Sequence, residues 1–215
     1  MNARKLLAAA AALAVLGGAA ASGAQTAAEP PIKIGAIFSI TGPAAFLGAP
    51  EEKTVKMMVD QVNAAGGVAG KRIEVLIRDS AGNPQQAISL GKQLIEEEHV
   101  FAIVGPSTSG ESMQLKGICN DAKTILVSCA AAEAIVDPVT PYVFKTPQKD
   151  SDAVRRIYET MKALKIDTIG VTSSNTGFGS AGKAQLEKIA PEYGITIAIS
   201  EVYDKSATDL TSVVT

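Results

Sequence analysis

Val104-Gly105-Pro106-Ser107-Thr108-Ser109-Gly110 is the stretch from which the fold can be predicted. It follows a short apolar run, 101–104, that is typical of a buried strand, and it precedes a helical pattern that starts at Glu111. This order predicts a strand that leads directly into the N-terminus of a helix. Free amides and the helix dipole favour a carboxylate, a phosphate or a carbonyl oxygen at such a terminus. The simpler interpretation is that Ser107 or Ser109 only caps the helix.

Strands and helices alternate on both sides of this stretch. In chain order, we expect strand 32–38, helix 50–65, strand 72–78, a helix capped by Asn83 with Pro84 at its first position, strand 101–104, helix 111–119 and strand 124–127. Repeated short units of this kind predict an α/β fold, with a parallel sheet flanked by helices on both faces. Ligands bind beyond the carboxyl ends of such strands, where the loops 39–47, 79–80, 105–110 and 128–132 would converge. This convergence favours a binding site over a simple helix cap.

The alternation breaks at Asp137-Pro138-Val139-Thr140-Pro141 and resumes after an expected crossing at 146–150. The second series predicts helix 151–165, strand 168–172, loop 173–179, helix 180–190 and strand 195–203. The sequence then ends on one capped helical turn, 209–215, with no stop signal, and nothing covers the far side of the last strand. We therefore expect a partial sequence.

The N-terminus predicts export. Arg4-Lys5 precede an unbroken apolar run, 6–16, and small residues continue through Ala24. A charged region, a short apolar region and a zone of small residues form a signal peptide, which we expect to be cleaved near Ala24, with Ala21 or Ala28 as alternatives. A membrane span needs about 20 apolar residues, and two glycines interrupt this run earlier. The mature chain is expected to be soluble and periplasmic.

Composition and single residues exclude several other functions. A hydrophobic content of 47% permits a sizeable core, and a net charge of −2 without a basic cluster argues against nucleic-acid binding. Cys119 and Cys129 flank a five-residue strand of about 16 Å, whereas the Cα atoms of a disulfide lie within about 7 Å. We expect two buried thiols. His99, the only histidine, follows three glutamates at a helix end, so we expect neither a metal site nor a cofactor.

Five segments carry a resemblance to a known family. In chain order they are Ile32-Lys33-Ile34-Gly35 with Thr41-Gly42-Pro43, Asn63-Ala64-Ala65-Gly66-Gly67-Val68-Ala69-Gly70, Arg78-Asp79, Ile103-Val104-Gly105-Pro106 and Tyr142-Val143-Phe144. Their order and spacing resemble type I periplasmic solute-binding proteins of the leucine/isoleucine/valine-binding family. The resemblance covers everything after the signal peptide. It implies two α/β lobes around a hinge, a ligand enclosed between them, and delivery of that ligand to an ABC permease in the inner membrane.

The resemblance also implies a division of the chain. We expect a signal peptide over 1–24, lobe one over 25–146 and a partial lobe two over 147–215, because members of the family are longer than this chain. The missing part would complete both lobes. The full-length protein is expected to be a monomer and not an enzyme.

Site residues are carried over from the family one position at a time. The hydroxyl that binds the ligand carboxylate falls on Ser109, with Ser107 and Thr108 beside it. Backbone contacts fall on Ala130 and Ala131. The remaining positions are an aromatic of the first loop near Phe46 and Leu47, a threonine of the amino-acid binders that is Ala132 here, and an aromatic of lobe two at Phe178.

This pattern favours one ligand class over another. The carboxylate donors are present, whereas a hydroxyl is missing at Ala132 and the acidic group that holds an α-ammonium would lie beyond Thr215. The ligand is therefore expected to be a carboxylate, either an amino acid or, preferably, an aromatic or branched organic acid.

Other functions are considered and receive less weight. Residues 177–182 satisfy the G-x-G-x-x-G pattern of dinucleotide sites, but their expected strand ends several residues earlier, whereas a dinucleotide turn follows its strand directly. An exported enzyme would need a base near Ser109, for which only Asp79 and Asp150 are candidates. A ligand-sensing receptor domain has the same lobes, and it would differ only in the downstream sequence.

Overall fold

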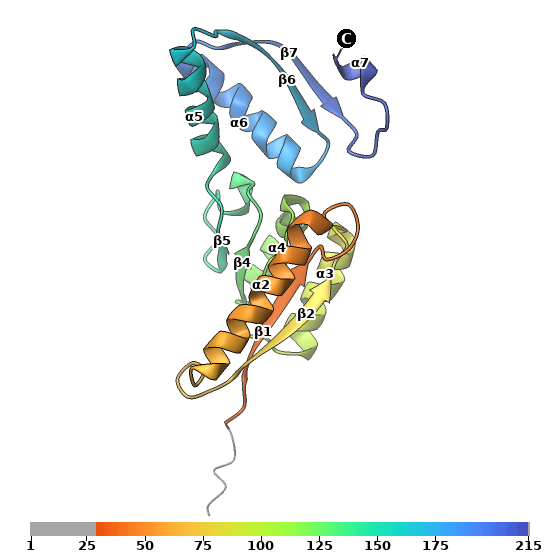
Figure 1. The fold of residues 1–215 in the computed structure, drawn as a ribbon, viewed down its shortest axis with the longest axis vertical. Coiled ribbons are helices and arrows are strands. Elements are labelled where there is room, and N and C mark those ends of the chain that lie inside the picture. The colour runs from red at the N-terminus through yellow and green to blue at the C-terminus, as the bar shows by residue number, and fades with distance from the viewer. Residues whose placement is uncertain (1–28, 215) are drawn as a thin grey trace, which may run out of the picture. The chain divides into compact units, whose positions relative to one another are not determined.

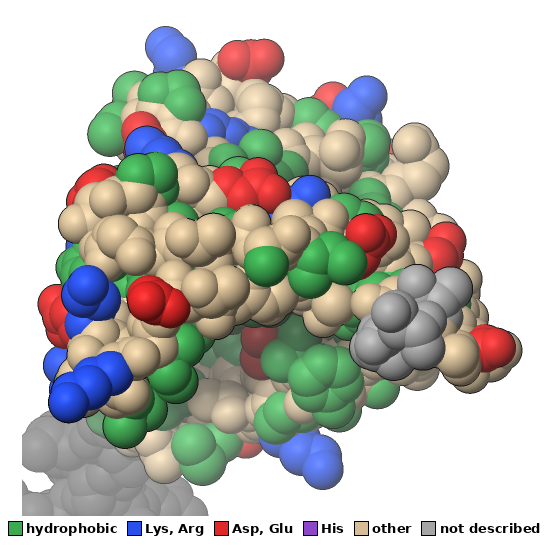
Figure 2. Space-filling model, turned by 90° about the horizontal axis from the view of Figure 1, so that it is seen from above, with side chains coloured by type: hydrophobic (Ala, Val, Ile, Leu, Met, Phe, Trp, Pro, Cys, Tyr) green, Lys and Arg blue, Asp and Glu red, His purple; other side chains and the backbone are tan. Residues whose placement is uncertain are grey.

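The computed structural model describes residues 29–214 of the chain, so the predicted signal peptide lies outside the described residues. Within the described range, no helix is both long enough and apolar enough to cross a membrane. On the face seen in Figure 2, acidic and basic side chains are interspersed with hydrophobic ones, and the basic ones form no continuous patch there.

A five-stranded parallel sheet forms the centre of the first lobe (Figure 1). Its strands are β1 (Ile32–Phe38), β2 (Ile73–Asp79), β3 (Ala102–Val104), β4 (Ile125–Ser128) and β5 (Val143–Lys145). The order across the sheet is β2-β1-β3-β4-β5, and every neighbouring pair is parallel. The predicted strands up to β4 are confirmed, and β5 adds a fifth strand in the segment between the prolines.

Helices cover both faces of this sheet. They are α2 (Ala45–Ala64), α3 (Pro84–Lys92), which continues as the π-helical turn η1 (Gln93–Glu97), α4 (Ser109–Asp121) and the 3-10 turn η2 (Glu133–Ile135). Because β2 and β3 lie on opposite sides of β1, right-handed crossovers place α2 on one face and α3 and α4 on the other. The contacts agree, since α2 packs on β1 and β2 while α3 and α4 pack on each other.

The core of the first lobe lies between the sheet and the pair α3 and α4. Ile37, Ile103 and Leu126 project from three strands towards Leu94 and Leu115, and all five side chains are fully buried. Burying a side chain of this size stabilises the fold by about 1.5–3 kcal/mol. This core fixes the sheet, and the sheet in turn fixes the loops at its carboxyl edge.

The second lobe contains two parallel strands and two long helices. The strands are β6 (Thr168–Ser174) and β7 (Thr196–Tyr203), and the helices are α5 (Asp150–Ala163) and α6 (Gly177–Tyr193), followed by the short α7 (Thr211–Val214). Val154, Tyr158 and Ile189 form a second buried cluster. No strand of the described residues pairs with the outer edge of β7. Ile199 and Val202 of this strand are 54% and 49% exposed.

Two reciprocal hydrogen bonds hold the crossing between the lobes. The Glu133 N–H donates to Asp150 Oδ2 at 2.8 Å, and the Ser151 N–H donates to Glu133 Oε2 at 3.0 Å. They join η2 to the first turn of α5. The predicted lobe boundary at 146/147 falls between β5 and α5 and stays a prediction.

Helix α2 begins earlier than the sequence predicted. The expected start at Pro50 follows a segment rich in glycine and proline that indicates a turn, but the helix starts at Ala45 and Pro50 lies inside it. Phe46 and Leu47 are therefore helical and not part of a turn. Gly48 makes this start possible, because a Cβ at this position would lie 2.3 Å from the Ser39 carbonyl oxygen.

Helix α6 also begins earlier than predicted. Strand β6 runs to Ser174, and Thr176 caps α6 by accepting a hydrogen bond from the Gly179 N–H at 3.1 Å. The predicted loop 173–179 therefore shrinks to two residues. Its glycines indicated a loop, but they lie in the first turn of the helix.

The predictions for the two cysteines and the histidine agree with the structure except for the burial of Cys129. Both thiols are free, as expected, but only Cys119 is buried and Cys129 is half-buried. His99 is exposed just after η1, which agrees with a solvated helix end.

Candidate ligand-binding site

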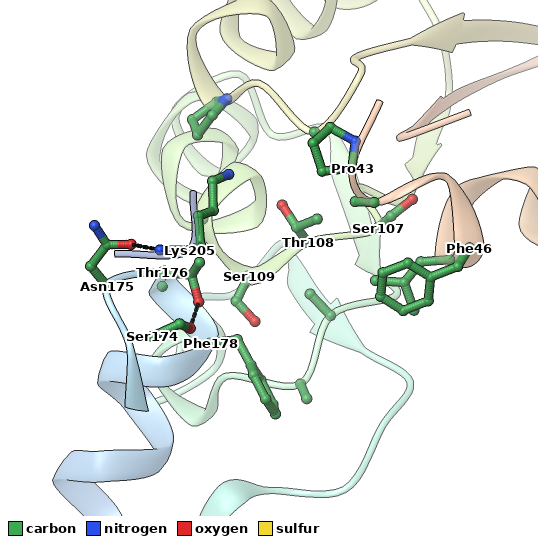
Figure 3. A pocket seen from close by; sticks show the side chains of 18 of the residues that line it. Pro43, Phe46, Ser107, Thr108, Ser109, Ser174, Asn175, Thr176, Phe178 and Lys205 are labelled. Atoms are coloured by element: carbon green, nitrogen blue, oxygen red, sulfur yellow. Dashed lines mark hydrogen bonds between the residues drawn. The ribbon is translucent and has the colours of Figure 1, made fainter. Parts of the chain in front are cut away.

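The loops at the carboxyl edge of the first sheet and the start of α6 surround a cavity of about 800 Å³ (Figure 3). This volume is typical of small-molecule sites. Eight of the nine residues predicted for the site line the cavity: Phe46, Leu47, Ser107, Thr108, Ser109, Ala130, Ala131 and Phe178. The structure thus brings together residues from four segments that lie far apart in the sequence.

Two of the three loop hydroxyls donate their hydrogens to carboxylates of the protein. Ser107 Oγ accepts from the Ser39 N–H at 3.0 Å and donates to the Glu51 carboxylate. Thr108 Oγ1 donates to Glu111 Oε2 at 2.5 Å, and these two residues form a capping box at the start of α4. The helix cap that the sequence placed on a neighbouring serine therefore falls on Thr108.

Ser109 is the hydroxyl that keeps its hydrogen free. The residue is 3% exposed, and its Oγ accepts a hydrogen bond from the Ala132 N–H at 3.2 Å. None of the described residues accepts the hydrogen of this hydroxyl. Buried polar groups are usually satisfied, so the unpaired O–H of Ser109, at the first position of α4 and on the cavity wall, is suited to an anionic oxygen.

Ala132 is the one predicted site residue that does not line the cavity. The residue is 1% exposed and is absent from the cavity wall, because its N–H anchors Ser109 from beneath and the turn η2 begins directly after it. Ala130 and Ala131 do line the cavity, although the Ala130 N–H is already donated to Ser128 Oγ at 3.1 Å.

Behind Ser107 lies a carboxyl group that is partly withdrawn from water. Desolvation raises the pKa of Glu51 above its usual 4.5, the hydrogen bond from Ser107 lowers it, and the nearby charge of Glu111 raises it further. Cys129, on the cavity wall, has a pKa of about 11, chiefly because of desolvation and then because of the charge of Glu51. The thiol is therefore protonated at neutral pH.

The sequence did not predict most of the lobe-two wall. Residues 174–177, Tyr203 and Lys205 line the cavity together with the predicted Phe178. Ser174 Oγ and Thr176 Oγ1 lie 2.7 Å apart in a hydrogen bond. Figure 3 shows Ser174, Asn175, Thr176 and Lys205 on the opposite side of Thr108 and Ser109 from Phe46. The available signal was the position of these residues at the carboxyl ends of β6 and β7.

Two of the three glycines of the G-x-G-x-x-G pattern allow close packing, whereas a Cβ on Gly182 would meet nothing within 4 Å. A Cβ on Gly177 would lie 2.9 Å from the Gly110 nitrogen, and a Cβ on Gly179 would lie 2.2 Å from the Ser174 carbonyl oxygen. The starts of α4 and α6 can therefore approach each other at the cavity. Packing thus accounts for Gly177 and Gly179 without a dinucleotide.

Neither candidate base for an enzyme lies on the cavity wall. Asp79 accepts hydrogen bonds from the Ile40, Thr41 and Ala81 N–H groups and from the Thr41 hydroxyl. Burial raises the pKa of Asp79, but these bonds outweigh it, so the pKa is lowered overall. Asp150 accepts from the Glu133 N–H. Both carboxylates stabilise loops, and the arrangement supports binding more than acid–base chemistry.

Comparison with known proteins gives one consistent result. The family profile described as "Periplasmic binding protein" matches residues 31–215. A Leu/Ile/Val-binding protein homolog 7 from Brucella suis biovar 1 (strain 1330) is 28% identical over 193 residues, which are 85% of this chain and 48% of that protein. The chain thus spans about half the length of the curated relatives it matches.

Two solved structures show the same fold. The substrate-binding protein LivJ of a branched-chain amino acid transporter from Streptococcus pneumoniae str. Canada MDR_19A, in complex with isoleucine, superposes with a TM-score of 0.74 at 27% identity, covering 86% of this chain and 53% of LivJ. A solute-binding protein of an ABC transporter from Rhodopseudomonas palustris BisB5, in complex with 3,4-dihydroxybenzoic acid, gives a TM-score of 0.75 at 21% identity, covering 85% and 50% of the two chains.

Proposed function

This chain belongs to the periplasmic binding protein family, and on this premise we propose that the full-length protein is the solute-binding component of an ABC importer. It captures a small carboxylate between two lobes and delivers it to a permease in the inner membrane. The predicted signal peptide would place it in the periplasm. N-terminal sequencing of the exported protein tests this placement, and a mature chain that starts after Ala24 is the expected result.

The observation that carries the proposal is the free hydroxyl hydrogen of Ser109. It lies on the wall of a cavity of ligand size, at the positive end of a 13-residue helix. Ser107 and Thr108 line the same wall but donate to Glu51 and Glu111. Ser109 is therefore the loop hydroxyl best placed to bind the ligand carboxylate.

Two phenylalanines on the cavity wall favour an apolar or aromatic ligand body. Phe46 is 76% exposed and Phe178 is 58% exposed, so both rings have apolar surface to cover. An aromatic contact adds about 0.5–1.5 kcal/mol beyond the burial of its area. We favour an aromatic or branched organic acid over leucine, isoleucine or valine, although the fold itself holds both isoleucine and an aromatic acid in other proteins.

Calorimetric titration of the full-length protein with leucine and with 3-phenylpropanoate tests the ligand class. We expect the aromatic acid to bind and leucine to bind more weakly. Burial of an α-ammonium without a partner costs several kcal/mol, and the described cavity wall contains no carboxylate. Submicromolar leucine binding without any response to the aromatic acid would reverse this choice.

A further inference from the structure

The cavity wall carries charge of one sign. Lys205 is the one charged side chain among the described residues that line the cavity, and neither an aspartate nor a glutamate is among them. The other lining residues are apolar, hydroxyl-bearing or small, apart from Asn175. A ligand that enters therefore meets a cation and no anion on the part of the wall that is described.

The main chain of Lys205 is held in place at the cavity. Its N–H donates to Asn175 Oδ1 at 3.1 Å (Figure 3). The Asn175 N–H in turn donates to the Tyr203 carbonyl oxygen at 2.9 Å. The turn after β7 is thus tied to the loop between β6 and α6. The Cα atom of Lys205 is therefore held in place, whereas the side chain beyond it can rotate.

No ion pair neutralises this lysine within the part of the chain that is described. The adjacent carboxylate, Asp204, accepts hydrogen bonds from the Ser206 N–H at 2.8 Å and from the Ser206 hydroxyl at 2.5 Å. Asp204 therefore stabilises its own turn. The charge of Lys205 also lowers the pKa of Asp204, as the last of the causes, but the two side chains form no ion pair, so the ammonium can pair with a ligand.

Two helix termini add to the positive potential of the same wall. Helices α4 and α6, with 13 and 17 residues, both begin at the cavity, where Gly110 and Gly177 come into contact. Each N-terminus carries a partial positive charge. Together with the unpaired O–H of Ser109, which is almost fully buried, they complement a negative group.

We infer that Lys205 is a specificity-determining residue that selects anionic organic acids against zwitterionic amino acids of the same shape. This inference rests on the proposed function and names the ligand class of the same site. The lysine attracts an acid whose only charge is negative. It repels the ammonium of an amino acid, so that the net electrostatic gain of the zwitterion is small.

The test compares ligands that differ only by the ammonium group. The full-length protein is titrated calorimetrically with 3-phenylpropanoate and phenylalanine, and with 4-methylpentanoate and leucine. The variants are Lys205→Gln and Lys205→Glu. Lys188→Gln, an exposed lysine of α6 outside the cavity wall, is the matched control for the loss of one charge.

We expect Lys205→Gln to weaken the acids by about tenfold while the amino acids change little, and Lys205→Glu to reverse the preference. Lys188→Gln should behave like the wild type. If the Lys205 variants change the affinity for the acid and for its amino acid equally, or change neither, the proposed role of Lys205 is wrong. The proposed function would be unaffected by that result. A wild-type protein that binds none of the four compounds would overturn the proposed function, and this inference with it.

Discussion

The hydroxyl of Ser107 donates a hydrogen bond to the carboxylate of Glu51 and so connects the loop after β3 to the second turn of α2. The same hydroxyl accepts the Ser39 N–H from the loop after β1. A single side chain therefore ties two loops and a helix together at the edge of the cavity. The partly desolvated carboxyl of Glu51 makes this junction sensitive to pH.

Glu51→Gln should change how stability depends on pH. A carboxyl whose pKa is raised in the folded state adds stability below its unfolded pKa, near 4.5, and this contribution is lost as pH rises through the raised value. Glutamine keeps an acceptor for Ser107 but does not titrate. The free energy of unfolding of the wild type, minus that of the variant, should fall across this window in urea titrations of the full-length protein. Glu52→Gln is the control, and parallel curves for wild type and Glu51→Gln would contradict the prediction.

Ser109→Ala should weaken ligand binding without unfolding the protein. Loss of a hydrogen bond to a charged group costs about 1.5–3 kcal/mol, which corresponds to roughly tenfold or more in affinity. Ser89→Ala removes an exposed hydroxyl of α3 that bonds only within its own helix, and serves as the control. Melting temperatures check the folding of both variants. Unchanged affinity of Ser109→Ala for every ligand found would remove Ser109 from the site.

Gly48→Ala and Gly117→Ala should have opposite effects on stability. A Cβ at Gly48 would lie 2.3 Å from a backbone oxygen, whereas a Cβ at Gly117, in the interior of α4, meets nothing within 4 Å. Overpacking costs about 1–3 kcal/mol, and a relaxed helical glycine gains up to about 1 kcal/mol on change to alanine. Chemical denaturation of the full-length protein measures both. A neutral Gly48→Ala would show that α2 can shift away from the loop after β1.

Residues 25–215, expressed alone, should aggregate or show weaker amide-exchange protection after Asp150 than before it. The first lobe buries its core between its sheet and the helices α3 and α4, whereas the two-stranded sheet of the second lobe leaves Ile199 and Val202 exposed on β7. Exposed apolar strand edges favour association. Uniform protection on both sides of Asp150 in a monomer would show that these residues form a complete fold.

Much of the fold could be predicted because its signals are local. Asn83 and Pro84 start α3 as the sequence predicted, since the side chain accepts the Gln85 and Gln86 N–H groups and proline lacks the N–H that would be unpaired there. The start of α2 was missed because Gly42, Pro43 and Gly48 indicated a turn before Pro50. What moves that start to Ala45 is the contact of Gly48 with another loop, which no local pattern shows.

The candidate site was predictable in position and less so in chemistry. Loops that follow parallel strands meet at one edge, which brought Ser109, Ala130 and Phe46 together. The roles of neighbouring hydroxyls could not be separated from sequence, because the partner of Ser107 lies 56 residues away. Lys205 was missed for a similar reason, since a turn and a distant asparagine place it.

Cys129 places a thiol of low reactivity on the cavity wall. Thiolates, rather than thiols, react with oxidants and electrophiles, and a pKa of about 11 leaves almost none of this sulfur ionised at neutral pH. Cys119 is protected further, with a pKa of about 12 in the buried interior of α4. At neutral pH both sulfurs should therefore react more slowly with oxidants and electrophiles than an exposed thiol of ordinary pKa.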